Sequence, residues 1–62
     1  MHKFEVELET LDIVEKTFQN LKEIVEYEDP EKLFDICEIA ADQARKKNPN
    51  LDINAYDVKI VK

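Results

Sequence analysis

Few residues in this chain could do chemistry. It has one cysteine, one histidine, no glycine and no serine, which excludes a glycine-rich phosphate loop and a serine nucleophile. Cys37 would need a base beside it to act as a nucleophile, and the only histidine, His2, stands at the N-terminal end. One histidine and one cysteine are also too few for a structural zinc site within the chain. We therefore expect no catalytic residues, no metal site, no cofactor and no enzymatic activity.

The acidic side chains invite a second chemical interpretation, as general acids or cation ligands. None of their groupings has the Asp-x-Asp-x-Asp-Gly pattern of a calcium loop, and none stands in an apolar run that would raise the pKa of a carboxyl group. Solvated surface explains them better. Cys37 itself falls on the apolar side of an expected helix, so we expect it to be a small buried hydrophobe.

The charge is distributed unevenly. The net charge of −6 comes entirely from the first 29 residues, which contain three basic and nine acidic side chains. Residues 30–62 contain six basic and six acidic side chains and are neutral. This argues against direct nucleic-acid binding, which needs a basic patch. It fits a basic partner, with plain solubility as the alternative.

Two periodicities indicate the elements that would position these charges. Residues 2–9 alternate apolar and polar side chains, which predicts a half-buried strand. From residue 11 to about 27, apolar residues at three- and four-residue steps, including Phe18, predict an amphipathic helix with Phe18 in the core. Asp29 as N-cap and Pro30 at the first helical position predict a second helix ending before Asn48-Pro49. Residues 56–62 alternate again and predict a second strand, while residues 51–54 stay ambiguous.

This order predicts a single α+β domain over residues 1–62, in which a helical hairpin packs on a two-stranded sheet (β-α-α-β). The strands have no other partners, so we expect them side by side, with Glu5 or Glu7 facing Lys59. Without glycine, a tight two-residue hairpin is not expected, which fits strands separated by helices. Because both sheet edges stay open, dimerisation by edge pairing would extend the sheet. Tyr27 and Tyr56 are expected at the core edge, with interface contacts as the alternative.

The sequence thus favours a small acidic protein-binding module, a regulator or inhibitor that engages a basic groove of a larger, nucleic-acid-handling protein. Its size and acidity are typical of phage-encoded inhibitors and antitoxins, an analogy of class that no motif supports. The alternative is a structural protein that homo-oligomerises through its strand edges. No apolar run is long enough to span a membrane, no signal peptide is expected, and a single unpaired cysteine suggests the cytoplasm. The residues predicted to contact the partner are Glu5, Glu7, Glu9, Glu15, Glu23, Glu26 and Ile39.

Overall fold

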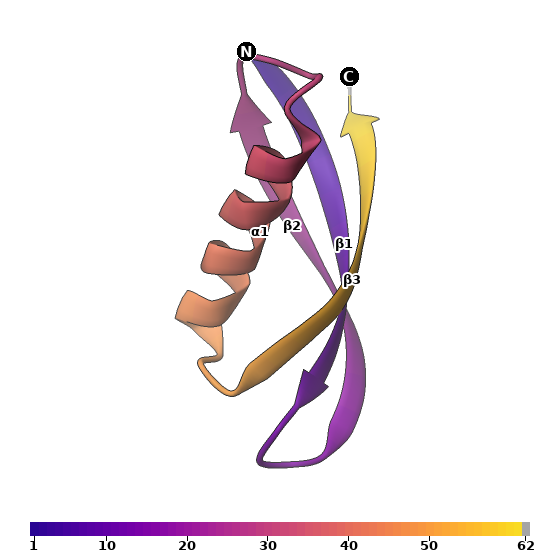
Figure 1. Ribbon diagram of the computed structural model, residues 1–62, viewed down its shortest axis with the longest axis vertical. Helices are drawn as coiled ribbons and strands as arrows, with labels where there is room; N and C mark the ends of the chain where they lie inside the picture. The colour runs from indigo at the N-terminus through magenta and orange to yellow at the C-terminus, as the bar shows by residue number, and fades with distance from the viewer. Residues whose placement is uncertain (62) are drawn as a thin grey trace.

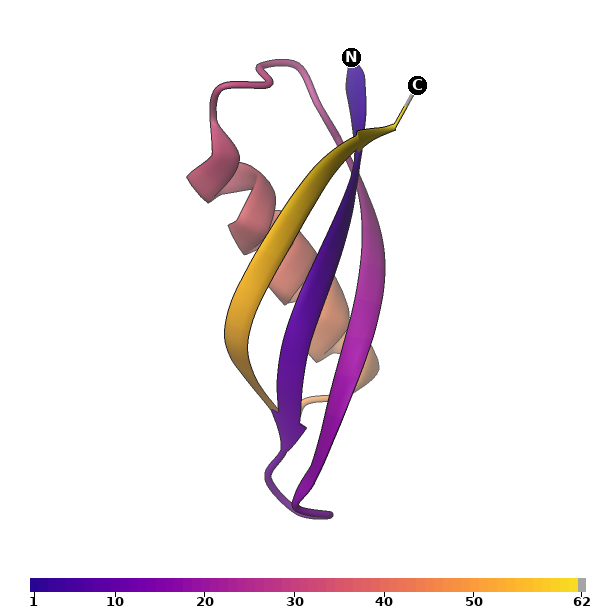
Figure 2. The same cartoon turned by 90° about the vertical axis from the view of Figure 1, so that its right-hand side faces the viewer.

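The computed structural model describes residues 1–61 and contains three strands and one helix (Figure 1). The elements are β1 (His2–Asp12), β2 (Thr17–Tyr27), α1 (Leu33–Lys47) and β3 (Leu51–Val61). The strands form one antiparallel sheet in the order β2-β1-β3, so the first strand of the chain is the central one. The helix lies across one face of this sheet (Figure 2).

The core lies between β1 and α1. Alternate residues of β1 point toward the helix, and Phe4, Val6 and Leu8 are completely buried there. Neighbouring strands add Val25 and Leu51 to the same cluster. Because side chains of a strand alternate between its two faces, this arrangement sends the odd-numbered residues of β1 to the opposite face of the sheet.

The helix packs closely on the sheet through small side chains. Ile36 and three alanines, Ala40, Ala41 and Ala44, are its buried residues. Alanine leaves room for the backbone of α1 to approach the sheet, while Ile36 supplies the volume that fills the core.

A four-residue turn, residues 13–16, joins β1 to β2 without any glycine. The Asp12 carboxylate accepts hydrogen bonds from the backbone N–H of Val14 (3.0 Å) and of Glu15 (2.9 Å). The N–H of Lys16 closes the turn on the Asp12 carbonyl at 2.7 Å, and Lys16 itself takes a left-handed backbone conformation, with φ of 56°. The aspartate therefore organises a four-residue turn. A tight two-residue hairpin is absent here, as predicted, but β1 and β2 are joined directly and not separated by a helix.

The helix predicted for residues 11–27 is therefore wrong, since this segment forms the turn and β2. A four-residue step satisfies a strand as well as a helix, so the Leu21 and Val25 spacing fits both. The segment is rich in β-branched and aromatic residues, which favour strands. Because a charged residue, Glu23, occupies a core-facing position, the alternation of apolar and polar residues that marks a strand is interrupted in this segment. Phe18, which we expected in the core, is 80% exposed.

The second predicted helix is confirmed as α1, but its expected start is not. Asp29 does not cap the helix, because its carboxylate accepts from the N–H of Glu31 (2.9 Å) and its carbonyl from the N–H of Lys32. Asp29 and Pro30 thus form a turn that precedes the helix. The second predicted strand, residues 56–62, is confirmed over residues 56–61 and is longer than expected, since it also includes residues 51–55. Residue 62 lies outside the described part of the chain.

The α+β class holds, while the predicted β-α-α-β arrangement is corrected to β-β-α-β, with one helix on three antiparallel strands. The expected pairing of the first and last strands is observed and is antiparallel. Within residues 1–61, α1 is too short and too polar to cross a membrane.

The different burial of two phenylalanines generates a first prediction. Phe4→Ala should lower the free energy of unfolding by about 3–5 kcal/mol, because it removes a fully buried ring. Phe18→Ala should change it by less than about 0.5 kcal/mol. Urea denaturation followed by circular dichroism measures both. A large loss of stability in Phe18→Ala would contradict the assignment of this segment to a strand.

The turn at Asp12 generates a second prediction. The N–H of Glu15, the amide of Asn48 and the N–H of Val14 stabilise the carboxylate and lower the pKa of Asp12 below its usual value. A lowered folded-state pKa stabilises the fold above the unfolded-state pKa of about 3.9, and this contribution is lost as the pH falls through the folded-state value. Asp12→Asn should be less stable than the unsubstituted chain at pH 7, with a difference that shrinks below about pH 4. A difference that stays constant with pH would refute this role.

Candidate functional site

The face of the sheet opposite α1 is uncovered within residues 1–61, and Figure 2 looks directly onto it. The odd-numbered residues of β1 lie along its middle. Among them, Glu5, Glu7 and Glu9 form a row of carboxylates on one strand, as the alternation predicted. We call this surface the open face.

The strand register shows what surrounds this row. Glu5 lies between Ile24 of β2 and Lys59 of β3, which confirms the predicted cross-strand pair with Lys59. A second lysine, Lys22, approaches Glu5 from β2, with its Nζ 3.5 Å from Glu5 Oε1. Both groups of this ion pair are solvent-accessible, so it contributes about 0–1 kcal/mol. Lys22 also lies directly opposite Glu7 in the β1–β2 pairing, so lysines stand beside both Glu5 and Glu7. Glu9, between Asn20 and Ala55, is the member of the row without a neighbouring lysine.

The acidic character is strongest toward β3. Asp57 lies opposite Glu7 in the β1–β3 pairing, so two carboxylates face each other across the strands. Together with Glu9, Ala55 and Tyr56 they line a shallow hollow of about 110 Å³. The strand register places six acidic and three basic side chains on the whole open face: Glu5, Glu7, Glu9, Glu26, Asp52 and Asp57, against Lys3, Lys22 and Lys59.

Three predicted contact residues do not belong to this face. Glu23 points toward the helix and is only 6% exposed, with both of its carboxylate oxygens 3.0 Å from Lys47 Nζ. Ile39 is half-buried and packs against the core. Glu15 lies in the β1–β2 turn. Glu23 therefore contacts Lys47 of the helix and Ile39 packs against the core, and neither lies on the open face. Glu23 was predicted on the polar side of a helix over residues 11–27, which the structure replaces with a turn and β2.

The open face also contains acidic residues that the prediction missed. Asp57 and Asp52 reach it from β3, and the β2 residue Glu26 joins it as predicted. Alternation in residues 56–62 already separated Asp57 from Tyr56. The predicted pairing of this strand with residues 2–9 already placed Asp57 on the same face as Lys59, so the signal was present although Asp57 was not among the predicted contact residues.

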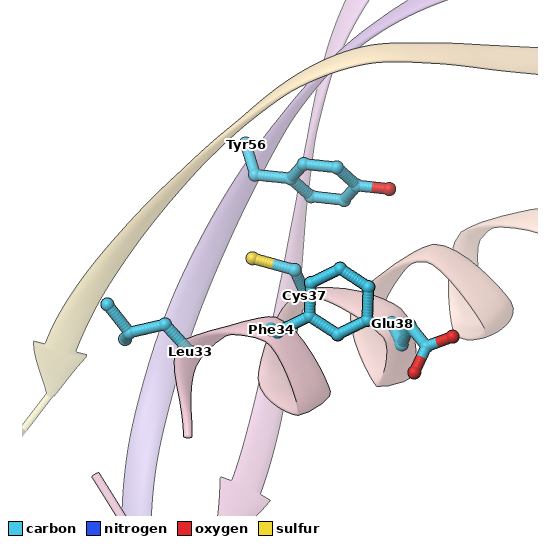
Figure 3. Close-up of a pocket in the computed structure, with 5 residues that line it drawn as sticks. All are labelled: Leu33, Phe34, Cys37, Glu38 and Tyr56. Atoms are coloured by element: carbon cyan, nitrogen blue, oxygen red, sulfur yellow. The ribbon is translucent and has the colours of Figure 1, made fainter. Parts of the chain in front are cut away.

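A second surface feature is an apolar groove between the start of α1 and β3 (Figure 3). Leu33, Phe34, Cys37 and Glu38 line its helix side and Tyr56 its strand side, around a hollow of about 380 Å³. Large apolar side chains are exposed here, with Phe34 at 78%. We call this hollow the α1–β3 groove.

The side chains of the two tyrosines and Cys37 differ in their surroundings. Tyr27 packs against the core and donates a hydrogen bond to Asp35 Oδ2 at 3.1 Å, which raises the pKa of Tyr27. Tyr56 instead lines the α1–β3 groove. Cys37 is half-buried rather than buried, and partial burial raises the pKa of its thiol.

Within residues 1–61, no three His, Cys, Asp or Glu side chains are grouped so as to hold a metal ion. In comparisons with known proteins, no family model, no curated protein and no solved structure matches this chain. Its open face and α1–β3 groove are therefore interpreted from their own residues.

The environment of Cys37 generates a third prediction. Because burial raises the pKa of its thiol, a smaller fraction is thiolate at pH 8 in the folded chain than in the unfolded one, and the thiolate is the reactive form. Alkylation by iodoacetamide should be slower in buffer than in guanidinium chloride. Mass spectrometry follows the reaction at a single site, since Cys37 is the only cysteine. Equal rates in the two solvents would contradict the packing described here.

Proposed function

We propose that this chain is a small protein-binding module that regulates or inhibits a larger protein by engaging its basic surface through the open face. The observation that carries the proposal is the open face itself, where six carboxylates and three ammonium groups occupy a sheet surface that α1 leaves uncovered. A rigid sheet holds these charges at fixed spacings, which favours recognition of a complementary surface.

The position of the charges supports this choice of surface. The helix carries three acidic and three basic side chains and is neutral. One of these basic side chains, Lys47, pairs with Glu23 of β2, so the helix and Glu23 together carry a charge of only −1. The unbalanced charge of the fold is thus concentrated on the open face and in the connecting loops. A basic partner would gain from long-range attraction to this face, and the complex would weaken as salt screens it.

The site has no groups that would act on the partner chemically, so its effect would come from occupancy. A groove that binds an acidic polymer would be blocked by a face carrying Glu7, Glu9 and Asp57 side by side. A nucleic-acid-handling protein is the class of partner that offers such a groove. Assembly with further copies of the same chain is the second candidate, and the α1–β3 groove favours it.

The fourth prediction tests the open face with a charge-matched control. Glu5→Gln, Glu7→Gln and Glu9→Gln together remove three carboxylates from the open face. Glu28→Gln, Glu31→Gln and Asp42→Asn remove three exposed carboxylates from outside it. Tagged forms of both triple variants and the unsubstituted chain are used to capture partners from host lysate at low and high salt. Mass spectrometry identifies what each of them retains.

At low salt, we expect the unsubstituted chain and the control variant to retain one basic protein. The open-face variant should bind this protein at least tenfold more weakly, a difference of about 1.4 kcal/mol in binding free energy. High salt should release it from all of them. Equal loss in both triple variants would mean that total charge, and not the open face, determines binding. Equal retention in both would refute the proposal.

A further inference from the structure

The two edge strands of the sheet differ in how far α1 protects them. On β2, Lys47 pairs with Glu23. In the amide orientation that satisfies both of its polar atoms, Gln43 donates to Glu23 Oε1 (3.3 Å) and to the backbone carbonyl of Ile24 (3.2 Å). Two helix side chains thus lie on the second half of β2. Among the hydrogen bonds of residues 1–61, none brings a side chain to the backbone of residues 52–61. Within residues 1–61, β3 is therefore the edge strand to which no helix side chain donates a hydrogen bond.

The exposed part of β3 is also regular. The only irregularity in its pairing with β1 lies between Glu9 and Thr10, opposite residues 53–55, so residues 55–61 pair without interruption. This segment contains no proline and no bulge, two of the devices that prevent an edge strand from pairing with another chain. A third device, charge, is present as one residue of each sign, Asp57 and Lys59. Its central residue is Val58.

The side of β3 that faces the helix layer is apolar and incompletely covered. Tyr56 and Ile60 stand opposite Leu8 and Phe4 of the core, yet they remain 42% and 66% exposed. They adjoin the α1–β3 groove, where Leu33 and Phe34 are exposed as well. An unpaired backbone edge and an apolar groove therefore lie side by side.

We infer that this edge is the interface of a homodimer, in which β3 of a second copy pairs antiparallel with β3 about a twofold axis at Val58. In this register Val58 faces its own copy, Tyr56 faces Ile60, and Asp57 faces Lys59 of the second copy. An antiparallel pair accepts either kind of residue pair at its centre. The inference does not depend on the function proposed for the open face.

Charge complementarity selects this register over its neighbours. A twofold axis at Asp57 would place two aspartates opposite each other, and an axis at Lys59 would place two lysines there. Only the axis at Val58 gives two opposite-charge pairs, one on each side of the axis, which stabilise cross-strand pairing. A one-residue change of register, with the axis between two residues, would turn the second copy over, because strand side chains alternate between faces. It would thereby separate the two α1–β3 grooves.

The same axis places both helices on one side of the joined sheet. The two α1–β3 grooves then face each other above the new strand pair, so that Tyr56, Ile60, Leu33 and Phe34 of one copy lie against those of the other. The three-stranded sheet is doubled, and the open faces of both copies form one continuous acidic surface.

The fifth prediction is an exchange of charges across the axis, measured by sedimentation equilibrium. The 7.3 kDa chain should sediment with twice its mass at micromolar concentration. Asp57→Lys and Lys59→Glu each create two like-charge pairs across the interface and should weaken the dimer about tenfold. The double variant Asp57→Lys/Lys59→Glu recreates opposite pairs and should restore it. Circular dichroism confirms that each variant is folded.

A disulfide tests the register independently of charge. In a Cys37→Ser background, Val58→Cys brings two cysteines face to face at a Cα separation of about 4.5–5.5 Å, which a disulfide can bridge. The matched control, Ile60→Cys, places its cysteines about 14 Å apart along the strand, since each faces residue 56 of the second copy. Air oxidation should cross-link the first variant and not the second.

Three outcomes would overturn the inference. The first is a monomer in sedimentation at millimolar concentration, as expected if a strand of a different protein occupies the edge. The second is a dimer that neither single charge variant weakens, which would place the interface elsewhere. The third is cross-linking of Ile60→Cys as readily as Val58→Cys, which would exclude the register centred at Val58.

Discussion

The packing of a single helix against the central strand determines what the rest of this structure can do. Phe4, Val6 and Leu8 of β1 are completely buried beneath α1, and this contact holds together a sheet that has no second layer. A 15-residue helix covers one face of three strands and covers it unevenly, with its side chains reaching over β2 more than over β3. The open face and the β3 edge both follow from this shortage of covering elements.

Charged side chains make one of the two uncovered surfaces, the open face, compatible with water. They do not do so for the other, the α1–β3 groove. A sheet face without a covering layer can be exposed to water if it is polar. The carboxylates and lysines of the open face make it polar. The same carboxylates, held in fixed order on a sheet, give the face its affinity for a basic surface. The α1–β3 groove has no such charges beyond Glu38, so its exposed Phe34 and Tyr56 are best explained by a covering chain.

The sequence was informative where the apolar period was unambiguous. Alternation over residues 2–9 correctly predicted the first strand, its buried side and the acidic row of Glu5, Glu7 and Glu9. The alanine-rich helix was predicted nearly to its ends. Residues 11–27 failed because Glu23 occupies a core-facing position, and its partner, Lys47, comes from 24 residues further along the chain. Local periodicity cannot detect such a compensating contact. The same limitation hid the four-residue turn at Asp12, which joins two strands where a helix was expected.

The most direct test of the account concerns the neighbouring residues Ile24 and Val25 in β2. Ile24 is 50% exposed on the open face, whereas Val25 is 1% exposed beneath α1. A soluble paramagnetic agent that broadens the NMR signals of accessible methyl groups distinguishes the two sides of the strand. The account predicts strong relaxation enhancement at the methyl groups of Ile24 and little at those of Val25. Equal enhancement at both residues would mean that α1 does not cover one face alone, and would contradict the open face, the β3 edge and the functions derived from them.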